Sequence, residues 1–210
     1  MKKNILLFLA VFLVLFAGTR NQIIADEILP VSYTFDRATD TGSYAYHDWT
    51  GEQLIDGEYG IAPWTSDLGN GPAYEWVGWV HDTPVNIDFD FGVTALIDTI
   101  KIGTVQDHTN DVVIPSFEIF SFDGTSWISE EYLYVPESTD NDNLYLTYTF
   151  DDLGISSQYI RIALTHSYNG PWTFVDEVDF YEPVPEPASL ILLGSGLIGL
   201  ARVRKKMKEK

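Results

Sequence analysis

Two segments of the chain combine aromatic rings with amide and imidazole groups, as sugar-binding sites do. They are His108-Thr109-Asn110-Asp111 and His166-Ser167-Tyr168-Asn169-Gly170-Pro171-Trp172. A pyranose presents an apolar C–H face and polar hydroxyls, so its sites pair an aromatic platform with hydrogen-bonding side chains, usually on loops that a rigid scaffold displays. We expect sugar contacts from His108, Asn110, Tyr168, Asn169 and Trp172, with Tyr46-His47-Asp48-Trp49 as a third candidate segment.

The alternative for each of these aromatic residues is a place in the hydrophobic core, because large rings dominate the cores of β-sandwiches. We expect Trp64, Trp76 and Trp127 to be core residues rather than ligand platforms. For each histidine, the alternative is a surface or structural role.

The turn Asp56-Gly57-Glu58 has a composition that suits calcium. Ca²⁺ takes six to eight oxygen ligands from carboxylates and carbonyl groups. Gln53 and Ala62 lie on the same loop and can offer carbonyl oxygens. The sequence leaves two possibilities open, a structural Ca²⁺ site or an acidic turn without an ion.

Catalytic patterns are absent from the sequence. Paired carboxylates can cleave glycosidic bonds. Acidic residues are so frequent in this sequence, however, that a pair of them does not indicate a catalytic site. The four histidines (His47, His81, His108 and His166) lack metal-ligand spacing, and no serine stands in a G-x-S-x-G context. We therefore predict that the protein is not an enzyme.

The charge of the chain is divided sharply between its middle and its ends. Residues 26–183 contain 29 acidic residues and three basic ones, Arg37, Lys101 and Arg161, whereas the other nine basic residues of the 210-residue chain lie at the two ends. A nucleic-acid partner needs basic groups that neutralise phosphates, so the composition excludes one. It favours divalent cations or neutral ligands instead.

The N-terminal segment has the pattern of an export signal. Lys2 and Lys3 precede an apolar run from Ile5 to Ala17, and Ala25 is a plausible cleavage point. We expect a signal peptide over residues 1–25, with an uncleaved N-terminal anchor as the alternative. Either form implies export.

The C-terminal segment, residues 184–210, has three parts in a fixed order. The motif Pro185-Glu186-Pro187 comes first, then an apolar stretch from Ala188 to Ala201, then a basic tail. As a helix the apolar stretch is about 21 Å long, shorter than the ~30 Å hydrocarbon core of a bilayer. The basic tail would stay cytoplasmic.

This order resembles the PEP-CTERM sorting signal of Gram-negative bacteria. The resemblance implies processing by an exosortase near the Pro-Glu-Pro motif, transient membrane insertion of an apolar sorting helix, and an envelope or extracellular destination. It is often found where exopolysaccharide is made. The alternative is an ordinary C-terminal membrane anchor.

The sequence between these segments predicts an all-β domain at residues 27–182, which we call the body. Apolar and polar residues alternate in Val85–Phe91, Ile160–Leu164 and Val178–Tyr181, a period typical of half-buried strands. Turn signals such as Asp123-Gly124 separate the runs. The pattern favours an antiparallel β-sandwich or jelly roll.

The order of landmarks in the body resembles that of the discoidin domain, or coagulation-factor type C domain, which is related to galactose-binding-like carbohydrate modules. The landmarks, in chain order, are Leu54-Ile55-Asp56-Gly57, Trp64-Thr65-Ser66, Glu75-Trp76-Val77 with Phe89-Asp90-Phe91-Gly92, Ile97–Ile102, Phe117–Trp127, Gln158–Ile162, and Ser167–Gly170 followed by Asp176-Glu177-Val178.

The resemblance implies an eight-stranded jelly roll that binds glycans, lipids or protein surfaces through a rim of variable loops. It also implies that Glu177, on the last strand, completes a structural Ca²⁺ site at the acidic turn. Ala62 departs from the pattern, because relatives often have Thr there, and one side-chain ligand would be lost. The terminal cysteine pair of some members is missing too, since the chain has no cysteine.

These features together predict an exported binding protein of the envelope or exterior that recognises a polysaccharide. The alternative is a structural matrix or surface protein that acts through protein contacts without a specific glycan.

Overall fold

The computed structural model describes residues 25–39, 46–48, 50–60, 64, 75–80, 83–136, 144–166, 172–184 and 195–196. Residues Asp26–Pro183 form one compact unit, and the two terminal segments are grouped in a second unit. The predicted signal peptide up to residue 24 and the Pro185-Glu186-Pro187 motif lie outside the described residues. Of the apolar segment, only Ser195 and Gly196 are described, as helix. Within the part of the chain that is described, no helix has the length and apolarity to cross a membrane.

The first sheet is built around the last strand, β10 (Trp172–Tyr181). One edge of β10 pairs with β5 (Thr99–Gln106), which pairs in turn with β8 (Leu144–Phe150). Its other edge pairs with β3 (Val77–Val80) near the start of β10 and with β1 (Glu27–Ile28) near its end. All these pairs are antiparallel, so the predicted strand pattern is confirmed here.

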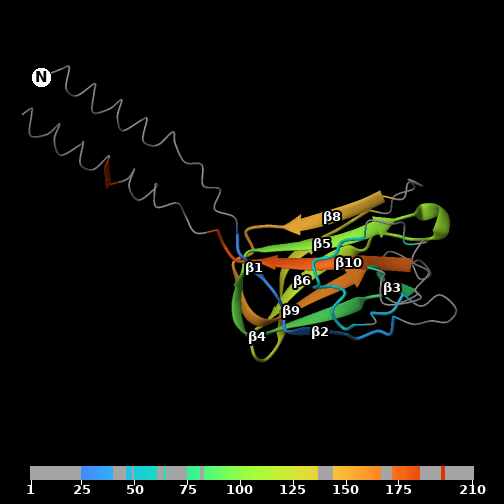
Figure 1. Ribbon diagram of the computed structural model, residues 1–210. Coiled ribbons are helices and arrows are strands. Elements are labelled where there is room, and N and C mark those ends of the chain that lie inside the picture. Colours follow the sequence, from blue (N-terminus) through green and yellow to red (C-terminus); the bar gives the residue numbers. More distant parts are fainter. Residues whose placement is uncertain are drawn as a thin grey trace, which may run out of the picture. The chain divides into compact units, whose positions relative to one another are not determined.

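The second sheet has the order β2-β4-β9-β6-β7 and is also antiparallel. Its strands are β2 (Ser32–Phe35), β4 (Val85–Ile97), β9 (Ile155–Thr165), β6 (Ser116–Phe122) and β7 (Trp127–Leu133). The two sheets face each other as a β-sandwich (Figure 1). The predicted all-β, antiparallel sandwich is therefore confirmed.

The core lies between the sheets and follows the alternation of the sequence. In β4 the apolar residues Val85, Ile87, Phe89 and Phe91 are buried, and the polar residues between them are half-exposed. The inward-facing residues of β9, β6 and β10 pack against them. Because a strand's side chains alternate between its two faces, one apolar face per strand suffices to close this core.

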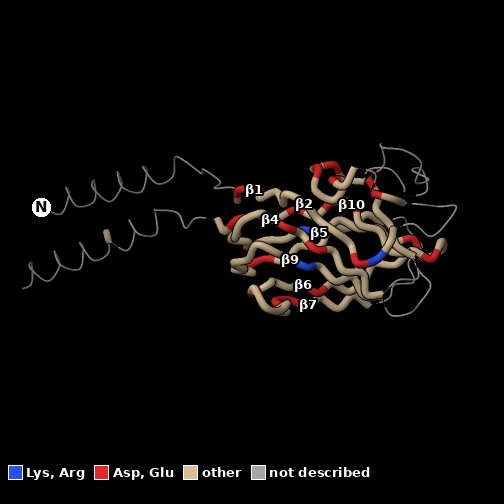
Figure 2. The backbone as a smooth tube through the Cα atoms, turned by 90° about the horizontal axis from the view of Figure 1, so that it is seen from below, with Lys and Arg blue, Asp and Glu red and all other residues tan. Residues whose placement is uncertain are grey.

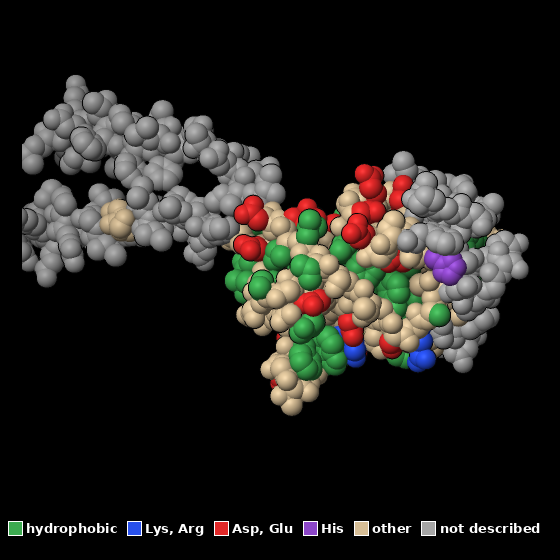
Figure 3. Space-filling view, turned by 60° about the horizontal axis from the view of Figure 1, so that its bottom comes forward, with side chains coloured by type: hydrophobic (Ala, Val, Ile, Leu, Met, Phe, Trp, Pro, Cys, Tyr) green, Lys and Arg blue, Asp and Glu red, His purple; other side chains and the backbone are tan. Residues whose placement is uncertain are grey.

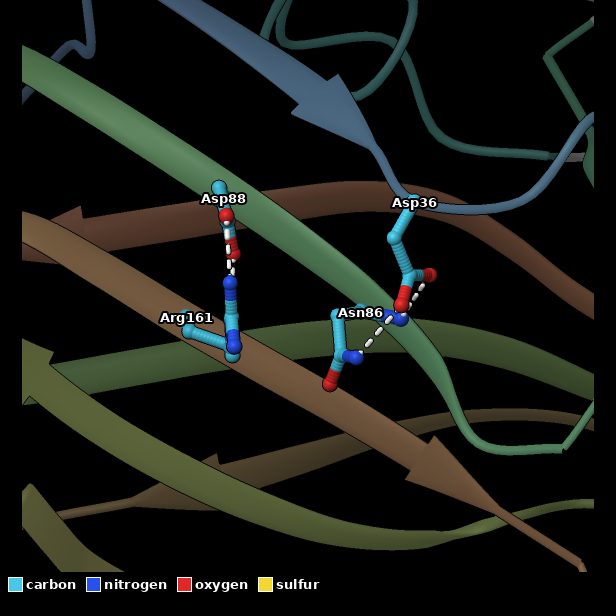
Figure 4. A network of polar contacts seen from close by, with 4 residues as sticks. All are labelled: Asp36, Asn86, Asp88 and Arg161. Atoms are coloured by element: carbon cyan, nitrogen blue, oxygen red, sulfur yellow. Dashed lines mark hydrogen bonds and ion pairs between the residues drawn. The ribbon is translucent and has the colours of Figure 1, made fainter. Parts of the chain in front are cut away.

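The outer face of the second sheet carries a polar and aromatic network that ties three strands together. Arg161 on β9 donates two hydrogen bonds to Asp88 on β4, at 2.6 and 2.7 Å, and Asn86 donates to Asp36 beyond the end of β2 (Figure 4). The Arg161 guanidinium also lies 4.3 Å from the centroid of the Trp127 ring.

This network corrects the prediction for Trp127. The residue belongs to neither core cluster and lies half-buried on the outer face. The alternation of β7 places it opposite Phe122, on the side that faces away from the core. A cation packed on an indole ring stabilises such a position.

Candidate functional site

The directions of the strands gather the candidate loops at one end of the sandwich. In the second sheet, the start of β4 and the start of β6 both pair with the end of β9. In the first sheet, the start of β10 pairs with the ends of β3 and β5. The connections β3–β4, β5–β6 and β9–β10 all cross between the sheets at this end. We call it the rim, with residues 36–39, 46–48, 107–115, 132–135, 165, 166 and 172.

The chain enters and leaves the body at the opposite end. There β1 pairs with the end of β10, through Glu27 opposite Tyr181. The Glu182 backbone N–H donates to the Asp26 carbonyl oxygen at 2.9 Å. The terminal segments therefore start from the end of the sandwich that is farthest from the rim.

Three of the five predicted sugar contacts are described, and the structure brings them together. His108 and Asn110 form a single 3-10 turn, η1 (His108–Asn110), between β5 and β6. The Trp172 backbone N–H donates to the Asp111 carbonyl oxygen at 2.7 Å, which joins this turn to the start of β10. Tyr168 and Asn169 lie outside the described residues.

The side chains of the turn differ in how they are engaged. The Asn110 amide donates to the Asp107 carboxylate at 2.6 Å, and the Trp64 indole N–H donates to the same carboxylate at 3.2 Å. His108 Nδ1 is buried without a hydrogen-bond partner. The turn is thus fixed by Asp107.

A second hydrophobic cluster, smaller than the main core and mostly aromatic, packs beneath the loops of the rim. Its buried members are Tyr46, Trp76, Val105, Val112 and Phe174, with Trp64 and Trp172 packed against them. The Trp172 ring stacks on Phe174 with centroids 5.5 Å apart and meets the Tyr46 ring edge-on at 5.5 Å. The predicted core position of Trp76 is confirmed, and Trp172 is half-buried, with a large part of its ring surface used in packing.

An open cavity of about 430 Å³ lies at the rim, beside the end of β2. Its lining residues include one aromatic residue and bear a guanidinium, an imidazole, two carboxylates and a hydroxyl: they are Phe35, Asp36, Arg37, Ala38, Thr39, His47 and Asp48. Cavities of this size hold small organic ligands. The lining offers the mixture of aromatic surface and hydrogen-bonding groups that a sugar ring needs.

Hydrogen bonds hold several of these groups in place. Asp48 accepts from the Gly51 backbone N–H at 2.7 Å, and Thr39 Oγ1 lies 3.4 Å from His47 Nδ1. Asp36 accepts from the Asn86 backbone N–H at 2.8 Å. Sequence reasoning found His47 and Asp48 but missed Asp36 and Arg37. The available signal was that Arg37 is one of only three basic residues in a strongly acidic body.

The loop with the acidic turn fills the gap that β3 and β1 leave on the edge of β10. The Val178 backbone N–H donates to the Leu54 carbonyl oxygen at 2.9 Å. The Gly57 and Gly60 backbone N–H groups donate to the carboxylates of Glu177 and Asp176, at 3.1 and 2.8 Å. The Tyr59 hydroxyl donates to Asp179.

This loop buries the polar residues of β10. Glu177 and Asp179 alternate with the apolar residues Val178 and Phe180, yet only 2% and 4% of their surface is exposed. Residues 54–60 cover them, and a β-bulge between Val175 and Val178 shifts the register at this point. A contact between segments so distant in sequence leaves no trace in local periodicity.

Burial has a strong electrostatic consequence for these acids. Desolvation, together with the negative charges of Asp179, Asp56 and Asp176, raises the pKa of Glu177 to about 9. Desolvation raises the pKa of Asp176 to about 6. Lys101 lies opposite Asp179 in the register and places its ammonium 4.5 Å from the centroid of the Tyr181 ring. A divalent cation would offset this accumulation of negative charge.

The predicted calcium ligands converge only in part. Asp56 lies next to the Gly57–Glu177 hydrogen bond, accepts from the Glu58 backbone N–H at 3.0 Å, and is exposed, as is Glu58. Gln53 is buried on the same loop, and Ala62 is outside the described residues. Among the described residues, no three acidic or histidine side chains are arranged to hold a metal. An ion here would need backbone carbonyl oxygens as well as carboxylates, which suits Ca²⁺.

The comparisons with known proteins bear on the two parts of the chain separately. Residues 183–205 match the family model of the PEP-CTERM protein-sorting motif. The motif implies that the protein is exported and sorted to the envelope or exterior, with processing by an exosortase. A search of curated protein sequences found no match.

Solved structures of carbohydrate-binding modules of family 32 (CBM32) resemble the body. The CBM32-5 module of CpGH89 from Clostridium perfringens, in complex with GalNAc-β-1,3-galactose, has a TM-score of 0.50 at 9% identity and covers 74% of this chain and 99% of its own. The CBM32 of AlyQ, in complex with 4,5-unsaturated mannuronic acid, has a TM-score of 0.46 at 18% identity, covering 75% and 99%. The CBM32 from C. perfringens NanJ, in complex with galactose, has a TM-score of 0.44 at 20% identity, covering 76% and 100%. The body therefore has the discoidin-like β-sandwich fold of CBM32 domains.

Proposed function

We propose that this protein is an exported, non-catalytic glycan-binding protein that holds a neutral saccharide at its rim. The observation that carries the proposal is the rim cavity, which Phe35, Arg37, His47 and Asp48 help to line on a fold shared with CBM32 domains. His108, Asn110 and Trp172 extend the polar and aromatic surface of the same end. Exopolysaccharide of the producing cell is the proposed ligand, since the sorting motif directs the protein out of the cell.

The charge of the body supports a neutral ligand. Acidic side chains are spread over the body, and basic ones are few (Figures 2 and 3). An acidic glycan would be repelled at low salt unless divalent cations bridged it. A neutral hexose avoids this repulsion.

We also propose a structural Ca²⁺ ion at the acidic turn, held by Asp56 and Glu177 with carbonyl oxygens of residues 53–62. The ion would neutralise the buried carboxylate of Glu177 and fasten the loop to β10. Its proposed role is to stabilise the fold.

The sorting route completes the proposal. A signal peptide over residues 1–25 starts export from a Gram-negative cytoplasm, and residues 188–201 insert transiently in the membrane until an exosortase acts near Pro185-Glu186-Pro187. Both terminal segments leave the body at the end of the sandwich opposite the rim.

Isothermal titration of the purified protein in Ca²⁺, against galactose, GalNAc-β-1,3-galactose and neutral bacterial polysaccharides, tests the proposal. The double variant Arg37→Ala/His47→Ala should weaken binding at least tenfold with an unchanged Tm. Lys101→Ala removes the same charge near the opposite end and should bind like the wild type. Absence of binding by folded, Ca²⁺-loaded protein would favour the structural matrix role instead.

A further inference from the structure

A second, smaller pocket of about 100 Å³ lies at the rim, on the side of the second sheet. Three chain segments meet there: Val113–Ser116 before and at the start of β6, Tyr132–Val135 at the end of β7, and Thr165–His166 at the end of β9. None of these residues lines the larger cavity. The two pockets are thus built from different segments.

The floor of the pocket is mostly apolar, with a fixed hydroxyl. Val113, Ile114 and Ser116 are buried. Ser116 Oγ accepts a hydrogen bond from the Val135 backbone N–H at 3.0 Å. A hydroxyl that accepts in this way keeps its own hydrogen for donation, so the floor offers apolar surface beside one hydroxyl donor.

Two tyrosines stand at the mouth of this pocket. Tyr132 is 54% exposed and Tyr134 is 63% exposed. Tyr132 lies in the edge strand β7, and Tyr134 follows the last residue of that strand; both line the pocket. Such large exposed rings contribute little to folding, and flat aromatic surface beside a pocket is suited to stacking against a sugar ring.

The size and charge of the pocket restrict what can enter it. A volume of 100 Å³ corresponds to about three water molecules and is below the roughly 300 Å³ of small-molecule sites. It therefore accepts a substituent rather than a whole ring. The described lining has no Asp, Glu, Lys or Arg side chain. It therefore favours an uncharged substituent whose outer end is apolar and whose inner end, next to the sugar ring, can form a hydrogen bond.

We propose that this pocket receives the acetamido group of an N-acetylhexosamine residue whose ring stacks on Tyr132 or Tyr134. The methyl group contacts Val113 and Ile114, and the amide carbonyl accepts from the Ser116 hydroxyl. The inference rests on the proposed glycan-binding function and names its substrate class. The site is separate from the cavity at Arg37 and His47.

Nuclear magnetic resonance titration of the full chain in Ca²⁺ tests the site directly. The probes are the β-1,4 trimer of N-acetylglucosamine and cellotriose, which differ at carbon 2 of each sugar. We expect the acetylated trimer to shift the amide resonances of Val113, Ile114 and Val135, and cellotriose to shift them at least fivefold less. The pocket-filling variant Thr165→Leu and the variant Tyr134→Ala should each weaken binding of the trimer at least fivefold.

A matched control lies on the same strand. Ile128→Ala removes an exposed apolar side chain of β7 outside the pocket and should leave trimer binding unchanged. If the trimer shifts no pocket resonance, or cellotriose shifts them equally, the inference is wrong whatever happens at the larger cavity. If the pocket responds while Arg37→Ala/His47→Ala changes no glycan binding, the inference stands and the proposed role of the larger cavity fails.

Discussion

The Glu177 carboxylate accepts a hydrogen bond from the Gly57 backbone N–H, which joins two segments 120 residues apart in the chain. Glu177 is nearly inaccessible to solvent, and its nearest charged neighbours are carboxylates. The acidic turn and the last strand therefore form one electrostatic unit. A proton or a cation would reduce the repulsion among these carboxylates.

Removal of calcium should destabilise the protein. A ligand that binds only the native state raises stability by mass action, so EDTA should lower the Tm by several degrees in a calorimetric scan. Asp56→Ala and Glu177→Gln should each abolish the difference between Ca²⁺ and EDTA. Glu131→Gln, a change at an exposed acid of β7, should preserve it. Identical melting of the wild type in Ca²⁺ and EDTA would contradict the metal proposal.

The stability of the metal-free protein should fall as the pH rises. The folded state raises the pKa of Glu177 from 4.5 to about 9 and that of Asp176 from 3.8 to about 6. Between pH 4.5 and 9 the native state therefore holds protons that the unfolded state has released, so the free energy of unfolding decreases with pH. This stabilisation is fully present below the unfolded pKa and is lost by about pH 9.

The measurement is the Tm in EDTA at pH 5, 7 and 9. We expect a steady decrease for the wild type and a flatter profile for Glu177→Gln. Ca²⁺ should weaken the dependence, because a bound cation favours the ionised carboxylate. A Tm in EDTA that stays constant over this range would show that Glu177 ionises at its ordinary pKa, and an increasing Tm would show that folding lowers this pKa.

The variant Arg161→Lys should lose about 1 kcal/mol of unfolding free energy, measured by urea denaturation. Lysine keeps the charge but cannot form the two parallel hydrogen bonds to Asp88 or stack as a plane on Trp127. A double-mutant cycle with Asp88→Ala should show coupling between the two sites. Additive effects would mean that the pair contributes nothing beyond its separate side chains.

The variant Gly78→Ala should destabilise the rim by about 1–3 kcal/mol, the usual range for overpacking a core. A Cβ atom at this position would overlap the Phe174 ring and approach the Tyr46 Cβ at 3.1 Å. Both residues belong to the aromatic cluster under the rim, so near-ultraviolet circular dichroism should change with the Tm. Thr34→Ala changes an exposed side chain of β2 and is the control; it should change neither the near-ultraviolet spectrum nor the Tm. An unchanged spectrum and Tm for Gly78→Ala would show that the cluster yields to the added methyl.

Sequence patterns were sufficient for the sheets and for much of the rim. The alternation in Val85–Phe91 matches the observed burial residue by residue, and that in Ile160–Leu164 matches it except at Ala163, which is buried as well. The resemblance to the discoidin domain implied that the loops of His108 and Trp172 both lie at the variable rim, and the structure joins the two loops through the Trp172–Asp111 backbone hydrogen bond. The cavity at Arg37 could not be predicted, because it is formed by two segments that share no motif.

The sequence by itself determined the class of fold, the acidic body and the sorting tail, since each depends on local composition and period. Tertiary structure alone decided that Glu177 and Asp179 are buried and that Trp127 lies on the outer face beneath Arg161. It also decided which segments enclose each rim pocket. These outcomes depend on contacts across tens of residues, and the free energies of desolvation and packing that govern them are set only when distant segments meet.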